Sequence, residues 1–594
     1  MTSAWRFGPR LEPAGGTTFR LWAPAARRVE LLIGERALPM QPPEPGWFAL
    51  HDAAAAPGAL YRFRIDGEIE VPDPASAFQP EDALGPSEVI DHRFAWQCPD
   101  WKGRPWHEAV VLELHVGALT QAGTFRAVAE RLDQIAATGI TAIELMPVAD
   151  FAGRWNWGYD GVLWFAPDSS YGRPEQLRAL VDAAHQRGLM VLLDVIYNHL
   201  GPEGNFLPRY APAFFTDRHR TPWGDAIDYR VPEVRAFAIE NALRWLDHYR
   251  FDGLRLDAVH AIVEPGEPHI LHELSRALGE FAAATGRHIH LVLENDDNRA
   301  SLLDPTSPMP RGKYRAQWND DYHHAWHVLL TSEHAGYYRD YAAAPAKALG
   351  CALVSGFVYQ GEPSEHRGGT RRGEPTTELP LTAFLNFLQN HDQIGNRRYG
   401  DRLTVLARPE ALEAALAITL LAPSPPLLFM GEEWGATEPF PFFCDFRGAL
   451  ADAVRHGRSS AFVDGCAQAE RTRPPPDPLA ETTFRQATLD WSQREREPFA
   501  ARLDLVGRLL ALRRRYVVPW LAGEGLVSTE CALHDGVLRV FWRKEGAGTL
   551  SLLAHLGEDA SFNGLPSPAA AWIWGGAPPI RLPAWSVYWW LEPG

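Results

Sequence analysis

Nearly continuous apolar runs alternate with amphipathic segments along the middle of the chain. The runs have the length of buried strands, and the amphipathic segments carry apolar residues three or four positions apart, as helices do. We predict strands at Val110–Val116, Thr141–Met146, Leu189–Tyr197, Gly253–Val259, His288–Glu294, Tyr314–Trp318, Thr382–Gln389 and Pro426–Met430. We predict helices near Thr124–Thr138, Pro174–Arg187, Glu233–Tyr249, Ile270–Ala284 and Glu410–Leu421. Strands separated by helices in this way favour a closed (β/α)₈ barrel.

An open, doubly wound parallel sheet is the alternative for the same alternation. It is disfavoured because no Gly-x-Gly-x-x-Gly nucleotide loop follows the first predicted strand. Short strands broken by Pro and Gly flank the barrel, for example Thr17–Trp22 before it and Val537–Trp542 after it. We therefore predict an α/β protein with a central TIM barrel, an N-terminal β-sandwich and a C-terminal β-domain. The predicted ranges are 1–92 for the sandwich, 93–500 for the barrel with its insertions, and 501–594 for a linker helix and the C-terminal β-domain.

The charge of the chain limits its partners. The formal net charge is −17 over 594 residues, which disfavours nucleic acid and anionic membrane surfaces as partners. Met1–Arg10 has no apolar core of signal-peptide length, and no apolar run in the chain is long enough to span a bilayer. We expect a cytoplasmic protein with no membrane and no nucleic-acid partner, and the oligomeric state stays open.

Cysteine and tryptophan usage adds two expectations. The five cysteines are scattered and odd in number, which argues against a disulfide framework or a zinc cluster and fits a reducing compartment. The 22 tryptophans favour a carbohydrate ligand, because indole faces stack on sugar rings. In the sandwich, however, we expect Trp22 and Trp47 to be core residues, and whether this domain binds glucan stays open.

Polar side chains gather where four predicted strands end. Arg255 and Asp257 alternate with apolar residues, so both face one side of their strand. The third strand ends in Asp194–His199, the fifth in Glu294 and the seventh in Asn390–Asp392. Because the strands of a parallel barrel end at one rim, these groups should converge there. A structural Arg–Asp pair would explain Arg255 and Asp257 alone, but not four polar strand ends.

Cleavage of a glycosidic bond needs two carboxyl groups in different protonation states. Asp257 suits the nucleophile, because Arg255 beside it favours the ionised form. Glu294 follows a mostly apolar strand, where desolvation favours the protonated form, so it suits the general acid and base. In a retaining enzyme the two carboxyl groups lie roughly 5–5.5 Å apart.

Other residues of the rim fit binding roles. We expect His199 and His391 to donate hydrogen bonds to sugar hydroxyls, and Asp392 to accept them from the distorted ring. Asp194 is expected to anchor a loop or to orient the arginine rather than to react.

The same stretches resemble the four sequence blocks of the α-amylase superfamily of glycoside hydrolases, in the same order. They are Asp194–His199, Gly253–His260, Leu293–Asn295 and Phe387–Asp392. The resemblance implies a nucleophile, an acid/base and a transition-state stabiliser, which are Asp257, Glu294 and Asp392 in that order. It implies supports for substrate and nucleophile at Arg255, His199 and His391, and a sugar-stacking aromatic at Tyr159.

A longer likeness narrows the choice to the maltooligosyltrehalose trehalohydrolase family. It is carried by Trp157–Gly172, Ala213–Asp217, Gly224–Tyr229, Leu293–Asn298, Gln317–His324 and Phe387–Arg397. This resemblance implies retaining hydrolysis of the α-1,4-glucosidic bond next to the terminal trehalose of maltooligosyltrehalose, a step of trehalose biosynthesis from maltooligosaccharide or glycogen. The alternatives are a glucan-branching transferase or an α-1,6 debranching hydrolase of the same superfamily. A non-catalytic glucan-binding barrel is disfavoured by the intact carboxylates.

One position departs from many α-amylases, which carry Lys-His where this chain has His260-Ala261. We expect His260 to contact the sugar just beyond the cleaved bond. The change also removes a histidine whose carbonyl holds a structural calcium ion in those enzymes, so we predict no required metal and no cofactor. A further group mixes oxygen and nitrogen with spacing that is poor for zinc, and we expect it to line a polar rim of the substrate cleft. Its members are Asp320, Asp321, His323 and His324.

Overall fold

The computed structural model describes residues 5–264, 266, 268–304, 313–461, 474–522, 527–557, 560–561 and 570–594. Within these residues, eight parallel strands close into a barrel in the order β10-β11-β14-β17-β18-β19-β22-β23. Their bounds are Val111–Leu114, Ala142–Leu145, Met190–Val195, Gly253–Leu256, His290–Leu293, Ala316–Trp318, Phe384–Phe387 and Pro426–Phe429. Each lies inside a predicted strand, so the barrel is confirmed and the open sheet is excluded.

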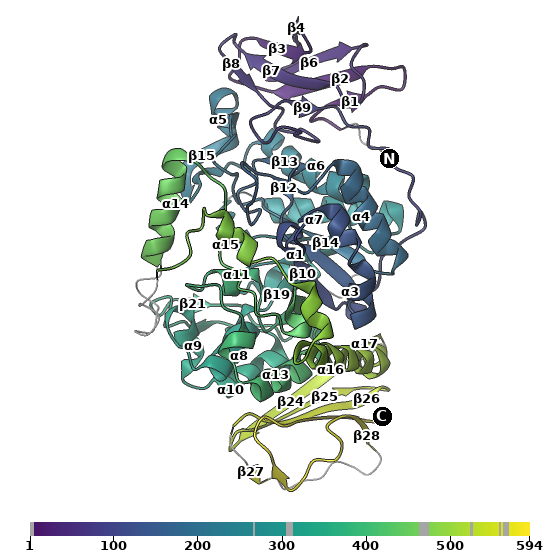
Figure 1. Cartoon of the computed structure of the whole chain (residues 1–594), viewed down its shortest axis with the longest axis vertical. Coiled ribbons are helices and arrows are strands. Elements are labelled where there is room, and N and C mark those ends of the chain that lie inside the picture. The colour runs from purple at the N-terminus through teal and green to yellow at the C-terminus, as the bar shows by residue number, and fades with distance from the viewer. Residues whose placement is uncertain are drawn as a thin grey trace.

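Helices surround the barrel and cover its outer surface (Figure 1). The longer ones are α3 Leu132–Thr138, α4 Pro174–Gln186, α6 Pro232–His248, α7 Ile270–Thr285, α8 Asp320–Thr331, α10 Pro345–Ser355, α13 Pro409–Leu421, α14 Gly448–Ala461 and α16 Phe499–Leu512. The shorter ones are α1 Val116–Leu119, α2 Phe125–Ala129, α5 Leu207–Tyr210, α9 Arg339–Ala342, α11 His391–Gly395, α12 Leu403–Leu406, α15 Glu481–Gln486 and α17 Val518–Ala522. The single helix predicted near Thr124–Thr138 is divided into α2 and α3, which are separated by Glu130 and Arg131. In the part of the chain that the structure describes, every helix is too short or too polar to cross a membrane.

The N-terminal strands form the expected sandwich, which sits above the barrel in Figure 1. Its sheets have the orders β1-β2-β6-β5 and β4-β3-β7-β8, with β9 paired to β7. The strands are β1 Arg10–Leu11, β2 Thr17–Trp22, β3 Val29–Ile33, β4 Arg36–Pro39, β5 Gln41–Glu44, β6 Trp47–Asp52, β7 Leu60–Ile65, β8 Ile69–Val71 and β9 Ser87–Glu88. Glu88 forms an ion pair at 2.6 Å with Arg173, just before α4. The backbone N–H of Phe7 donates to Glu240 of α6 at 3.1 Å, so polar contacts fasten the sandwich to the barrel.

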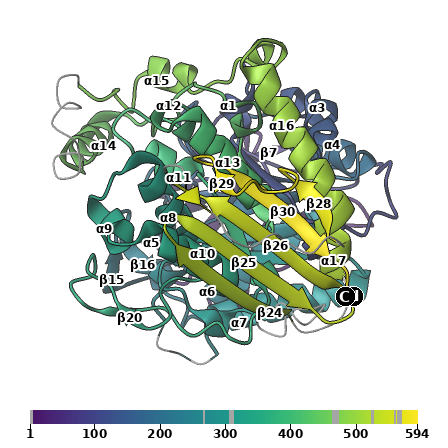
Figure 2. The same cartoon turned by 90° about the horizontal axis from the view of Figure 1, so that it is seen from below.

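The C-terminal part is an antiparallel sheet in the order β24-β25-β26-β30-β28. Figure 2 shows this sheet from below, and its strands contact α10 and α13 of the barrel. The strands are β24 Val527–His534, β25 Val537–Lys544, β26 Gly548–His555, β28 Ala571–Trp574 and β30 Val587–Glu592, with β27 Ala560–Ser561 and β29 Arg581–Leu582 as a separate pair. The α/β architecture with flanking β-domains is therefore confirmed, while the ranges 1–92, 93–500 and 501–594 stay predictions.

Three short hairpins decorate the barrel. They are β12 Ala149–Asp150 with β13 Leu163–Pro167, β15 Phe215–Thr221 with β16 Gly224–Ile227, and β20 Glu362–Pro363 with β21 Arg371–Arg372. The last two lie in the long insertions that follow β14 and β19, so residues far apart in the sequence can reach the rim.

The central strand β17 is shorter than the predicted Gly253–Val259. Its ladder with β18 ends at the pair Leu256–Leu293, and Ala258 then adopts a left-handed φ of 40°. The chain therefore turns directly after the barrel strand and leaves Asp257 at the rim.

The start of β17 requires glycine. A Cβ at Gly253 would lie 2.2 Å from the carbonyl oxygen of His290 and 2.4 Å from Leu192 Cδ2. Neither the backbone of His290 nor the packed Leu192 side chain has room to move away. The close approach of β14, β17 and β18 therefore depends on the absence of a side chain at Gly253.

We expect Gly253→Ala to destabilise the protein by about 1–3 kcal/mol, the usual cost of overpacking a core. Thermal unfolding of the variant would show a lower midpoint than the parent. Gly507→Ala is the matched control, because the nearest atom to its Cβ is Thr138 O at 3.9 Å and alanine favours the helix. Equal midpoints for Gly253→Ala and Gly507→Ala would contradict the packing argument.

Candidate active site

The polar groups at the strand ends meet on one guanidinium. Arg255 of β17 is 1% exposed. Its Nη1 lies 3.0 Å from Asp257 Oδ1 and 2.7 Å from Asp194 Oδ2, and its Nη2 lies 2.8 Å from Glu294 Oε2. The indole of Trp318 packs against it, with 4.2 Å between the guanidinium carbon and the ring centroid. A planar, permanently charged group thus orients three carboxylates at once.

The predicted pair of Arg255 with Asp257 and the orienting contact of Asp194 are confirmed by these distances. The surroundings of Glu294 differ from the expectation. The apolar strand before it does not isolate its carboxylate from charge, because Arg255 reaches it. The side chains of Asp257 and Glu294 stay 13% and 21% exposed, so both remain open to a bound molecule.

Asn198 completes the surroundings of Asp257. Its Nδ2 donates to Asp257 Oδ2 at 2.8 Å and to the carbonyl oxygen of Asp257 at 2.9 Å. Each carboxylate oxygen of Asp257 therefore has its own donor, which fixes the orientation of the group. The N–H of Ala258 donates to Glu294 Oε2 at 2.8 Å, so the turn after β17 also holds the second carboxylate.

Tyr159 is held by a hydrogen bond to Asp194. The phenol donates to Asp194 Oδ2 at 2.5 Å, and burial raises the pKa of Asp194 to about 7 despite its ion pair with Arg255. The Tyr159 ring stacks on His391 at 5.0 Å and 20°. Gly158, at φ 103°, makes this turn possible, because a Cβ there would lie 2.2 Å from Pro147 O.

His391 is bound by the buried carboxylate of Glu113, which the sequence did not predict as part of the site. Its Nδ1 pairs with Glu113 of β10, and its backbone N–H donates to Glu113 Oε2 at 3.1 Å. Burial alone would lower the pKa of His391, but the charge and hydrogen bond of Glu113 and the charge of Asp392 together raise it. An acidic residue inside the apolar run Val111–Leu114 is the sequence signal that could have pointed to this partner.

Asp392 and Asp320 also lie at the rim. Burial raises the pKa of Asp392, and its Oδ1 accepts a hydrogen bond from Asn396 at 2.6 Å. Asp320 accepts from Gln393 at 3.2 Å. Burial, reinforced by the negative charge of Glu294, raises the pKa of Asp320 well above its ordinary value. The predicted site thus brings further carboxyl groups close to the first pair.

The two other predicted histidines, His199 and His260, differ in how many contacts they make and how exposed they are. His199 contacts Tyr159 O through Nε2 at 2.7 Å and Asn198 through Nδ1, and its ring stacks on Trp223 at 3.6 Å. A sugar hydroxyl would have to displace one of these contacts. His260 is exposed, and its Nδ1 accepts from the N–H of Asp296 at 3.3 Å. A pocket of about 720 Å³ opens beside His199 and Trp223.

The group from Asp320 to His324 behaves differently from the prediction. Asp321, His323 and His324 are 0%, 1% and 6% exposed, so they do not line a rim, and that expectation is wrong for them. Asp321 pairs with Arg372 at 2.7 Å, so its carboxylate is bound within the protein. No group of three or more His, Cys, Asp or Glu among the described residues is arranged to hold a metal ion.

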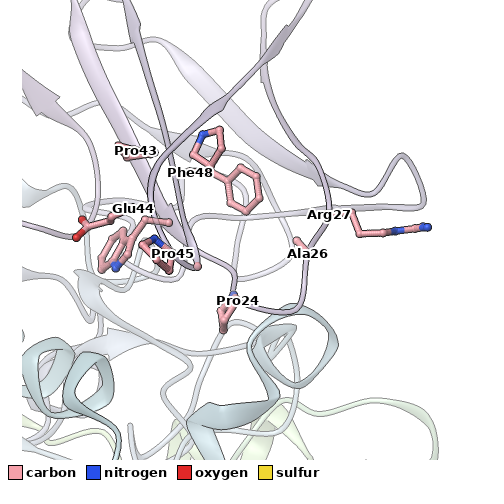
Figure 3. A pocket seen from close by; sticks show the side chains of 10 residues that line it. Pro24, Ala26, Arg27, Pro43, Glu44, Pro45 and Phe48 are labelled. Carbon is pink, nitrogen blue, oxygen red and sulfur yellow. The ribbon is translucent and has the colours of Figure 1, made fainter.

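The tryptophans of the sandwich are core residues, as expected. Trp22 and Trp47 are 8% and 1% exposed. Trp47 is flanked by Arg6 and Arg20, whose guanidinium carbons lie 4.9 and 4.8 Å from its ring. Figure 3 shows the pocket of about 490 Å³ beside it, which Pro24, Pro43, Pro45 and Phe48 help to line. The indole face of Trp47 is therefore not open to a sugar ring.

Comparisons with known proteins agree with this geometry. Residues 100–212 match the family model of the alpha amylase catalytic domain, and residues 6–77 match carbohydrate-binding module 48, the isoamylase N-terminal domain. The malto-oligosyltrehalose trehalohydrolase of Deinococcus radiodurans is 41% identical over 93% of this chain and 90% of its own length. That of Saccharolobus solfataricus is 38% identical over 82% and 83%. The chain belongs to the malto-oligosyltrehalose trehalohydrolase family.

Solved structures agree with the fold of the chain. A Salmonella typhimurium protein assigned to the alpha amylases superposes with a TM-score of 0.93 at 42% identity, and all of both chains is covered. A Paenibacillus barengoltzii pullulanase has a TM-score of 0.73 at 20% identity, which shows a common fold alone. A branching enzyme of Mycobacterium tuberculosis is 35% identical, but over only 42% of this chain and 37% of its own length.

The ion pair of Glu113 with His391 gives a pH-dependent prediction. Because the folded pKa of His391 is raised, the pair stabilises the fold fully below the unfolded imidazole pKa of about 6.5 and loses this effect as the pH rises through the folded value. We expect Glu113→Gln to destabilise the fold by about 3–5 kcal/mol at acidic pH. Thermal unfolding at several pH values would measure the effect.

The control is Glu130→Gln, whose side chain is 63% exposed. Its unfolding midpoint should follow that of the parent at every pH. A deficit of Glu113→Gln that stays constant from acidic to alkaline pH would contradict the assigned ion pair.

Proposed function

We propose that this chain hydrolyses the α-1,4-glucosidic bond adjacent to the terminal trehalose of maltooligosyltrehalose and releases trehalose, with retention at the anomeric carbon. The observation that carries the proposal is the Asp257–Arg255–Glu294 arrangement in a barrel of the trehalohydrolase family. Neighbouring nitrogens of one guanidinium hold the two carboxyl groups, which supports the short separation that a retaining pair needs.

In the first step, Asp257 attacks the anomeric carbon and Glu294 protonates the glycosidic oxygen, so trehalose leaves and a glycosyl ester forms at Asp257. Arg255 and Asn198 aim the nucleophile, because each binds one of its carboxylate oxygens. Arg255 binds the Glu294 carboxyl group in the free protein. To deliver a proton to the leaving oxygen, Glu294 has to turn away from Arg255.

In the second step, Glu294 takes a proton from water, and the water oxygen attacks the ester at the anomeric carbon. The bond to Asp257 breaks, and a shortened maltooligosaccharide leaves with its α configuration. Asp392 accepts hydrogen bonds from the distorted ring, Tyr159 supports its apolar face, and the charged His391 donates to a hydroxyl. These roles agree with the sequence expectation and rest on the positions of the groups around Arg255.

The wider setting is also inferred from the sequence. We infer a cytoplasmic location from the scattered cysteines, four of which, Cys98, Cys351, Cys444 and Cys531, are unpaired among the described residues. The net charge of −17 supports a neutral sugar as substrate in place of nucleic acid.

Removing either carboxyl group should lower kcat at least a hundredfold, as for other nucleophiles and general acids. We expect this for Asp257→Ala and Glu294→Gln, with trehalose release from maltotriosyltrehalose as the assay. Glu413→Gln, at 54% side-chain exposure, should keep the parental rate. Near-parental turnover in Asp257→Ala or Glu294→Gln would refute the role given to that residue.

The same assay separates the alternatives. The parent protein should release trehalose from maltotriosyltrehalose and leave amylose almost unchanged, and NMR should show the α anomer of maltotriose first. New branch points in amylose would instead favour the transferase, and cleavage of α-1,6 bonds would favour a debranching enzyme.

A further inference from the structure

Arg367 and Arg372, two arginines of an insertion, form ion pairs with the segment that follows Glu294. Arg367 Nη2 lies 2.5 Å from Asp296 Oδ2, and Arg372 Nη2 lies 3.1 Å from Asp296 Oδ1. Arg367 Nη1 also lies 2.8 Å from Asp297 Oδ1. Both arginines come from the insertion between β19 and β22, more than seventy residues after Asp296. The insertion is therefore fastened to the rim beside the proposed acid.

Arg372 is itself held by buried contacts. The side chain of Arg372 is 4% exposed. Its Nη1 bonds to Asp321 Oδ1 at 2.7 Å and to Tyr341 Oη at 2.8 Å, and its Nε donates to the carbonyl oxygen of Asp296 at 2.7 Å. Arg372 therefore binds both the backbone carbonyl and the carboxylate of Asp296, which fixes the position of the Asp296 side chain.

Asp296 lies close to the proposed acid, because the charges of Glu294 and Asp296 both act on Asp320. Tyr159 and His391 stack on each other, and the proposed function assigns them to the sugar that Asp257 attacks. The acid Glu294 must contact the oxygen that departs with the other sugar. Asp296 lies two residues beyond Glu294, and its N–H donates to His260, the residue that the sequence expectation places against the sugar just beyond the cleaved bond.

The carboxylate of Asp296 is available to a ligand. Its side chain remains 52% exposed although two arginines hold it. Burial would raise the pKa of Asp296, but Arg372 and Arg367 outweigh burial and keep the pKa below its ordinary value. An ionised carboxylate accepts strong hydrogen bonds from hydroxyl groups, and sugars present such groups in a fixed arrangement.

We propose that Asp296 is a specificity-determining residue that accepts hydrogen bonds from the hydroxyls of the departing trehalose, and that Arg367 and Arg372 are its positioning residues. The inference rests on the proposed function. Trehalose joins its two rings through both anomeric carbons, so its second ring presents hydroxyls in directions that differ from those of maltose. A fixed acceptor distinguishes such ligands because a mismatched one leaves it unpaired.

The test compares kcat/KM for maltotriosyltrehalose with that for maltopentaose, which has the same number of glucose units. Asp296→Asn should lower the preference for maltotriosyltrehalose about 10- to 100-fold, the effect of losing a hydrogen bond to a charged group. Arg372→Lys should lower it in part, because the carboxylate stays but loses one of its guides. The loss should appear mainly in kcat/KM for the trehalose substrate.

The matched control is Asp297→Asn, which removes a neighbouring carboxylate of 46% exposure that contacts Arg367 alone of the two arginines. It should keep the preference within about threefold of the parent value, because exposed ion pairs contribute little free energy. An unchanged preference in folded Asp296→Asn, or an equal loss in Asp297→Asn, overturns the inference. If Asp296→Asn does not fold, Arg367→Gln replaces it, and a lower preference supports the inference whereas an unchanged one overturns it. A parent protein that releases no trehalose removes the proposed function itself and the inference with it.

Discussion

The buried guanidinium of Arg255 is the constraint on which the site depends. It forms ion pairs with Asp194, Asp257 and Glu294, which come from three neighbouring parts of the barrel. Burying such charges is costly unless each has a partner at close range. The strands must therefore keep one register, in which Asp194 lies beside Arg255 and Leu256 beside Leu293. The fold and the chemistry are thus set by the same contacts.

The two reacting carboxyl groups differ in how firmly they are held. Asp257 has a separate donor on each oxygen, Arg255 on one and Asn198 on the other. Glu294 is more exposed, and both of its contacts, with Arg255 and with the Ala258 N–H, fall on Oε2. A nucleophile has to stay fixed and ionised, whereas an acid/base has to exchange a proton and reach two different oxygens. The difference in contacts and exposure between the two groups matches the difference in their tasks.

Local patterns in the sequence were enough for the barrel and for the centre of the site. The strand periodicity, together with the family resemblance, located all eight barrel strands, and the polar strand ends located Asp257 and Glu294, because these signals lie within a few residues. Other contacts around the site join residues that are distant in sequence. Glu113 meets His391 across 278 residues, and Arg372 meets Asp321 across 51. Such pairs form only when the barrel closes, so neither periodicity nor spacing reveals them. The same holds for Trp318 beneath Arg255.

The most direct measurement is the kcat of Arg255→Ala for trehalose release, with and without added guanidinium ion. Removing the shared cation should lower kcat at least a hundredfold, because nucleophile and acid lose their common support. Millimolar guanidinium should restore part of the rate by filling the vacated site, and ammonium should restore less because it lacks the planar fork. A rate within a few-fold of the parent without any additive would contradict the account.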